Sequence, residues 1–82
     1  MLKSPVKVRV KTDEDIINVK VTKVFRSVNP ITFQNNVNLM LEGSGKGIRL
    51  YCGTEEEAKA LVGEILEGKA ADLTDYPAKW NM

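Results

Sequence analysis

The chain begins with two segments in which apolar and polar residues alternate. In residues 5–12, valines occupy every second position and lysines or an arginine separate them. After an acidic break at residues 13–15, alternation resumes over residues 17–28 and changes phase after Thr22. A period of two residues is typical of a strand with one buried face and one solvent-exposed face. We therefore predict two strands over these segments, paired as a hairpin, with a bulge or bend near Lys23.

A second pair of strands is predicted further along the chain. Asn29-Pro30 marks a turn, because proline fixes its own φ and keeps the preceding residue out of the helical region. Residues 31–33 form either a short edge strand or a loop. Alternation returns over residues 37–42 and 48–52, on either side of a glycine-rich loop at residues 43–47. These two segments predict a second hairpin.

The strongest helix signal covers residues 55–67. Thr54 can cap the free N–H groups of the first turn, and Glu57 completes a capping box three residues later. Gly68 is a natural C-terminal stop. One face of this helix carries an apolar stripe at helical spacing, formed by Ala58, Leu61, Val62, Ile65 and Leu66.

These elements predict an α+β fold. We expect a small two-layer domain over residues 1–68, with an antiparallel four-stranded sheet and one C-terminal helix packed on one face (β-β-β-β-α). Residues 31–33 are the candidate for a fifth strand, with a loop as the alternative. Residues 69–82 are expected to form a C-terminal tail, in which Pro77 favours a turn or an extended end. Trp80 then either folds back on the domain or anchors a partner.

Charge divides this pattern into a basic part and an acidic part. Residues 1–52 carry nine Lys or Arg and four Asp or Glu, whereas residues 53–82 carry three and seven. The formal net charge of +1 therefore predicts no partner, and the 43% hydrophobic content is that of an ordinary globular protein. No apolar run approaches the roughly 20 residues that span a bilayer, and the N-terminus lacks the apolar core of a signal peptide. We expect a cytoplasmic accessory protein, bacterial or from a phage.

The chain contains no histidine and a single cysteine, Cys52. Histidine is the usual general base near neutral pH and the commonest metal ligand, so triads and zinc sites are excluded. An intrachain disulfide is also excluded, whereas an intermolecular disulfide and a carboxylate-only Mg²⁺ or Ca²⁺ site stay open. Cys52 is in phase with Ile48 and Leu50, which predicts a core position. We expect no enzyme and no cofactor.

Three segments resemble functional motifs without matching them. The loop at residues 43–47 lacks the first glycine of a phosphate-binding loop, since Met40 stands there, and a strand follows the loop instead of a helix. The acidic residues 13–15 lack the glycine and the distal glutamate of a calcium-binding loop, and they are predicted to be a solvated turn. Residues 55–57 are explained by capping and by the helix dipole.

One segment is similar to part of a known family. Residues 45–50 (Gly-Lys-Gly-Ile-Arg-Leu), followed by an acidic helix start, resemble the last strand and helix of the positive cofactor four family of single-stranded DNA-binding proteins. The resemblance covers about a quarter of the chain, and residues 51–53 lengthen the link beyond the family's pattern. It implies a β-β-β-β-α subunit that dimerises, and no residue roles are carried over.

Two functions are compatible with this pattern. The solvent face of the predicted sheet is basic, so one hypothesis is a module that binds single-stranded DNA or RNA. The alternative is a protein-interaction or inhibitor-like module that is homodimeric or binds a protein partner, through a sheet edge, the face around Met40 and Tyr51, or the tail around Trp80. A merely solvated sheet face would carry the same lysines and arginines. The predicted nucleic-acid-binding residues are Lys7, Arg9, Lys11, Lys20, Arg49 and Tyr51.

Overall fold

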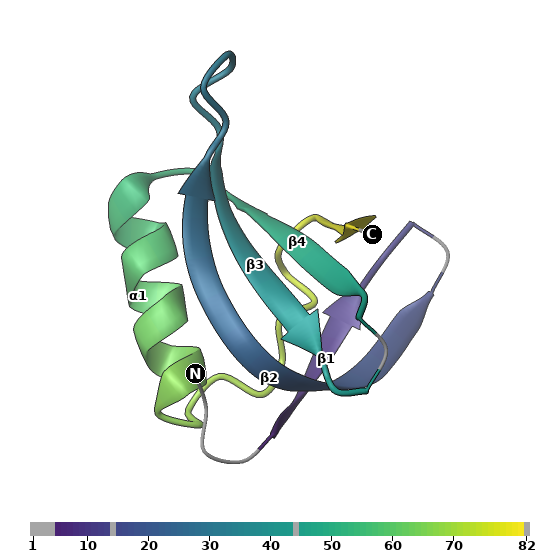
Figure 1. The fold of residues 1–82 in the computed structure, drawn as a ribbon. Helices are drawn as coiled ribbons and strands as arrows, with labels where there is room; N and C mark the ends of the chain where they lie inside the picture. Colours follow the sequence, from purple (N-terminus) through teal and green to yellow (C-terminus); the bar gives the residue numbers. More distant parts are fainter. Residues whose placement is uncertain (1–4, 14, 44, 82) are drawn as a thin grey trace.

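The computed structural model describes residues 5–13, 15–43 and 45–81. These residues form a small α+β domain, in which an antiparallel five-stranded sheet curls around a core and one helix covers part of it (Figure 1). Glu14 of the predicted acidic turn and Ser44 of the glycine-rich loop lie outside the described residues, as does the start of the N-terminus. The elements are β1 (Val6–Lys11), β2 (Ile16–Val28), β3 (Asn35–Leu41), β4 (Gly47–Cys52), α1 (Glu55–Leu66) and β5 (Ala78–Asn81).

The strands follow one another across the sheet in chain order, and each neighbouring pair is antiparallel. The long strand β2 pairs with β1 through its first half and with β3 through its second half. Its register shifts between Val21 and Lys23, which confirms the predicted bulge. Because a bulge adds one residue and reverses the alternation of side chains, Val21 before it and Val24 after it are both buried. The strand bends strongly as it passes from one half to the other (Figure 1).

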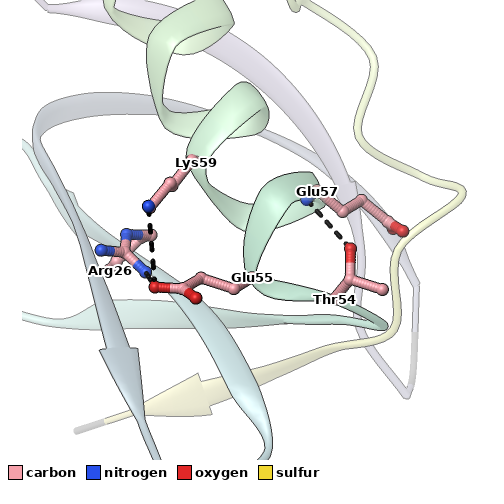
Figure 2. Close-up of polar contacts among 5 residues, drawn as sticks. All are labelled: Arg26, Thr54, Glu55, Glu57 and Lys59. Carbon is pink, nitrogen blue, oxygen red and sulfur yellow. Dashed lines mark hydrogen bonds and ion pairs between the residues drawn. The ribbon is translucent and has the colours of Figure 1, made fainter.

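The helix α1 begins and ends as the sequence predicts. The N–H of Glu57 donates to Oγ1 of Thr54 at 3.1 Å (Figure 2), which satisfies one of the free donors of the first turn. Gly68 takes φ +74°, the left-handed conformation that commonly ends a helix. The buried residues of the apolar stripe, Ala58, Leu61 and Ile65, pack the helix on β2, β3 and β4.

The helix is not C-terminal, which corrects the predicted β-β-β-β-α order. Within residues 69–81 the chain does not form a separate tail, because Ala78–Asn81 is a fifth strand that pairs antiparallel with β4. Residues 31–33, the segment considered for a fifth strand, form the loop between β2 and β3. A strand of four residues is too short to produce a clear alternation, and Pro77 immediately before it gave a turn signal.

The segment between α1 and β5 closes the curled sheet. On the free edge of β1, the N–H of Arg9 donates to the carbonyl of Ala71 at 2.8 Å, and the N–H of Leu73 donates to the carbonyl of Arg9 at 2.8 Å. On β4, the N–H of Tyr51 donates to the carbonyl of Pro77 at 2.9 Å. One continuous segment therefore satisfies backbone groups on both β1 and β4, which would otherwise be open edges.

The core lies inside this closed sheet and under the helix. Cys52 belongs to it as predicted, and its burial raises the pKa of the thiol. In the part of the chain that the structure describes, the single helix is too short to cross a membrane. The buried apolar residues are Val8, Val10, Val21, Val24, Val37, Leu39, Ile48, Leu50, Cys52, Ala58, Leu61, Ile65, Leu73 and Ala78.

One residue of the β2–β3 loop has an unusual backbone. Phe33 has φ +61° and is the one residue other than glycine with a positive φ in the described segments. A side chain with a Cβ in this left-handed region costs roughly 1–2 kcal/mol, which is why glycine and asparagine predominate there. Phe33 gains no burial in return, because 75% of its surface is exposed.

We expect the closing segment to stabilise the fold through Leu73, whose side chain is 1% exposed. The variant Leu73→Ala should lower the free energy of unfolding by about 2–5 kcal/mol, because it empties a core position between β1 and the rest of the sheet. The matched control Leu66→Ala removes a helix side chain that is 45% exposed and should cost less than about 1 kcal/mol. Urea denaturation of both variants measures the difference, and equal costs would contradict this role of the closing segment.

Candidate functional site

The register of the sheet aligns side chains into rows that cross β2, β3, β4 and β5. The central row consists of Phe25, Asn38, Arg49 and Lys79, which are directly paired from strand to strand. The row faces outward, because most of the residues that alternate with it along the strands are buried in the core, namely Val24, Val37, Leu39, Ile48, Leu50 and Ala78. With the rows on either side it forms what we call the outer face: Lys23, Phe25, Ser27, Asn36, Asn38, Met40, Arg49, Tyr51, Lys79 and Asn81.

The outer face carries three cations and no carboxylate. Lys23, Arg49 and Lys79 form no ion pair with any residue that the structure describes. The cations beside the acidic helix behave differently, because Glu55 pairs with Arg26 at 3.3 Å and with Lys59 at 3.7 Å. Both ion pairs are drawn in Figure 2. The helix therefore neutralises its own neighbours, whereas the positive charge of the outer face remains available to an external anion.

Three contacts orient polar groups on the outer face. Asn38 is 3% exposed and its Nδ2 donates to Oγ of Ser27 at 2.8 Å. Its Oδ1 accepts a long hydrogen bond from Nε of Arg49 at 3.5 Å, which leaves the two terminal nitrogens of the guanidinium for other partners. Nζ of Lys23 lies 5.4 Å from the centroid of the Phe25 ring, within the range of a cation–π contact.

Asn36 is the unexplained polar residue of this face. It lies between Ser27 and Tyr51 in the register and is 3% exposed. Its Oδ1 is buried and has no hydrogen-bond partner among the residues that the structure describes. A buried acceptor left unpaired costs about 1–3 kcal/mol, so this oxygen does not improve the stability of the fold. Its position beside a half-exposed aromatic ring makes it a candidate for ligand recognition.

Two adjoining grooves border the outer face beside Tyr51. One has a volume of about 460 Å³ and the other about 530 Å³, and both are also lined by Asp75, Tyr76 and Pro77. Burial, followed by the charge of Glu57, raises the pKa of Tyr76, so its phenol is protonated at neutral pH. The first groove carries balanced charge, because two lysines and two aspartates line it: Lys11, Lys79, Asp13 and Asp75.

The predicted nucleic-acid-binding residues fall on two parts of the sheet. Arg49 and Tyr51 lie on the outer face. The other four project from the β1–β2 hairpin, before the bulge, where Lys7 and Lys20 are directly paired. Lys11 alone links the two parts, since it lines the groove beside Tyr51. The four residues of the hairpin are Lys7, Arg9, Lys11 and Lys20.

The hairpin part also contains a carboxylate. Asp72, in the segment between α1 and β5, forms a parallel β-bridge with Arg9 through the backbone, and both residues line a shallow cavity on β1. Hydrogen bonds from the hydroxyl of Thr74 at 2.8 Å and from its N–H at 3.1 Å lower the pKa of Asp72. Asp72 is therefore ionised beside Arg9 and offsets part of the positive charge there. The residues of the outer face include no carboxylate, and the carboxylates nearest to it in the described chain are Asp13 and Asp75, which line the groove beside Lys79.

The three residues suggested for a protein partner do not share one surface. Met40 and Tyr51 are on the outer face. Trp80 pairs with Ile48 in the register and alternates with Lys79, so it lies on the opposite side of β5. About half of the Trp80 side chain is exposed there.

Several residues of the outer face were missed by reading the sequence. Phe25 is in phase with Val21 and was not among the predicted site residues, but the bulge reverses the alternation and turns it outward. The same reversal applies to Lys23. Lys79 lies in β5, which was not predicted. The bulge itself was the available signal, because a shift of one residue moves every later side chain to the other face.

Searches of protein-family models, of curated proteins and of solved structures found no match to this chain. Among the described residues, no three His, Cys, Asp or Glu side chains are grouped so that they could hold a metal ion. The site is therefore argued from its own geometry.

We expect Asn36 and Asn38 to differ in their contribution to stability, although both are buried on the same strand and face. Asn38→Ala should cost about 1–3 kcal/mol, because it removes the hydrogen bonds to Ser27 and Arg49. Asn36→Ala should cost less than about 0.5 kcal/mol or should stabilise, because its buried oxygen has no partner in the described chain. Chemical denaturation compares the two, and a larger cost for Asn36→Ala would show that its oxygen is satisfied in solution.

Proposed function

We propose that the chain is a small binding module that holds single-stranded nucleic acid on its outer face. The observation that carries this proposal is the central row Phe25–Asn38–Arg49–Lys79, which combines an aromatic ring with two cations on one side of the sheet. Tyr51 and Lys23 flank the row. Proteins that bind single strands use this combination, because cations contact the phosphates while bases stack on aromatic rings.

The spacing of the aromatic residues supports a single strand as the ligand. Phe25 on β2 and Tyr51 on β4 are separated by β3 and lie in neighbouring rows, so they are two strand spacings apart across the sheet and two residues apart along it, about 12 Å in all. Their faces are accessible only to bases that are not stacked in a duplex. Asn36 and Asn38 lie between the two rings, but both are 3% exposed, so a base edge reaches their amides only when neighbouring side chains move. The unpaired Oδ1 of Asn36 is an acceptor for a base amino group once Tyr51 rearranges.

The distribution of charge also supports a nucleic acid on the outer face. The three cations of the outer face are unpaired within the described chain, so each can neutralise a phosphate. Lys11, at the groove beside Tyr51, offers a route toward the hairpin cations. We propose that the hairpin cations extend the path of the nucleic-acid backbone beyond the outer face. They should contribute less to the affinity than the cations of the outer face, because Asp72 lies beside Arg9.

Fluorescence polarisation with a labelled 12-nucleotide oligo(U) or oligo(dT) tests this proposal. If three phosphates are neutralised, affinity should fall about 20-fold between 50 and 200 mM salt, from a slope of about −0.7 per phosphate for single strands. Arg49→Gln and Lys79→Gln should each weaken binding and reduce the salt dependence. Tyr51→Ala should weaken binding about 5- to 150-fold, as expected for the loss of one stacked base.

Two control variants locate the surface. Lys69→Gln changes an exposed lysine beyond the end of α1 that pairs with Glu67, and it should leave the affinity unchanged. Lys20→Gln changes a cation of the β1–β2 hairpin and should have a smaller effect than Arg49→Gln. Absence of binding at 50 mM salt would refute the proposal. Equal losses from Lys69→Gln and Arg49→Gln would show that binding is a general charge effect and not a property of the outer face.

A further inference from the structure

The buried oxygen of Asn36 needs a hydrogen-bond donor that the described chain does not supply. The side chain is 3% exposed, and its Oδ1 has no partner among the described residues. Its directly paired neighbours are Ser27 on β2 and Tyr51 on β4, so it lies on the outer face in the row beside the central row. Buried polar atoms are nearly always hydrogen-bonded, so the fold alone does not explain an asparagine at this position.

The side-chain amides on either side of Asn36 are already committed. Nδ2 of Asn38, two residues later on the same face, donates to Oγ of Ser27 at 2.8 Å and to a backbone carbonyl of β2 at 3.4 Å. Nε2 of Gln34, two residues earlier, donates to two backbone carbonyls at 2.8 and 3.4 Å. An amide nitrogen has only two N–H donors, so neither group can turn to Asn36 without losing a bond. A donor from outside the chain meets the need without that loss.

Tyr51 is the neighbour that can give a ligand access to this oxygen. Its side chain is partly buried and forms no hydrogen bond with the described residues, so its ring can turn without breaking one. Grooves of about 460 and 530 Å³ are both lined by Tyr51 and leave space for this movement. Directly paired residues have Cβ atoms about 4.5–5.5 Å apart, so a base stacked on the ring has its edge beside Asn36.

The chemistry of the free oxygen indicates which bases it fits. An amide oxygen only accepts, so the base must present an N–H to it. Adenine, cytosine and guanine carry an exocyclic amino group, which projects from the ring. Thymine and uracil have only an imino N–H, recessed between two carbonyl oxygens that a buried oxygen repels. An amino group can therefore reach Oδ1 of Asn36, whereas the edge of thymine or uracil presents oxygens to it.

We propose that Asn36 makes the outer face selective for bases with an exocyclic amino group over thymine and uracil. This inference rests on the proposed nucleic-acid binding and adds a base preference to it. Arg49 and Lys79 contact the phosphates of any strand, whereas Asn36 contacts the edge of the base that stacks on Tyr51. Phosphate contacts position a nucleic acid, and contacts to base edges give specificity.

Fluorescence polarisation with matched single strands of 12 nucleotides tests the preference. The strands are oligo(dT) in which the four central bases are replaced by cytosine, by uracil or by 2-pyrimidinone, which is cytosine without its amino group. The cytosine strand should bind about 2- to 10-fold more tightly than the pyrimidinone strand, as expected for one neutral hydrogen bond. It should also bind more tightly than the uracil strand.

Three variants assign the preference to one residue. Asn36→Ala should bind the cytosine and pyrimidinone strands equally. The matched control Asn38→Ala, on the same strand and face, should keep the ratio of the two affinities, because Oδ1 of Asn38 already accepts from Arg49. Arg49→Gln should weaken the binding of all strands and should also keep the ratio.

The outcomes separate this inference from the proposed function. Salt-dependent binding of the cytosine and pyrimidinone strands with equal affinity would overturn the preference and leave the proposed function standing. Water would then satisfy the oxygen of Asn36. A ratio unchanged in Asn36→Ala would also overturn the inference, because another group would distinguish the bases. Absence of salt-dependent binding to every strand would overturn the proposed function, and the preference with it.

Discussion

The two backbone hydrogen bonds between Arg9 and residues 71–73 determine how the rest of the chain is arranged. With the pairing of β5 on β4, they turn an open five-stranded meander into a closed sheet around one core. An 82-residue chain has little apolar surface to bury, so it depends on closure of this kind. Leu73 enters the core at the closure, and the backbone groups of β1 and β4 become satisfied. Closure also determines which side chains face the solvent.

The bulge between Val21 and Lys23 then determines the chemistry of the outside. It lets one strand bury valines in both halves of the domain while Lys23 and Phe25 turn outward. It also directs Arg26 toward the helix, where Glu55 neutralises it. The domain therefore separates paired charges at the helix from unpaired cations on the outer face, within the described residues. A nearly neutral chain thus acquires one surface suited to an anionic ligand.

Local patterns in the sequence predicted local structure well. The alternating valines, the Thr54 cap and the Gly68 stop lie where the residues indicated, because strand period and capping are short-range effects. The position of β5 was not predictable in the same way, since its pairing with β4 is a long-range contact between segments about 30 residues apart. The candidate site was only partly predictable for the same reason. Arg49 and Tyr51 followed from simple alternation, whereas Phe25 required the direction of the bulge and Lys79 required the fifth strand.

The central claim is that the outer face of β2–β5 is the surface that meets a nucleic acid. An NMR titration of the ¹⁵N-labelled protein with an unlabelled 12-nucleotide single strand tests this claim most directly. The account predicts chemical-shift changes concentrated at the amides of Phe25, Arg49 and Lys79 and at the side-chain amides of Asn36 and Asn38. The β2–β3 loop and the helix should show none. Shifts confined to β1 and the first half of β2, or no shifts at low salt, would contradict it.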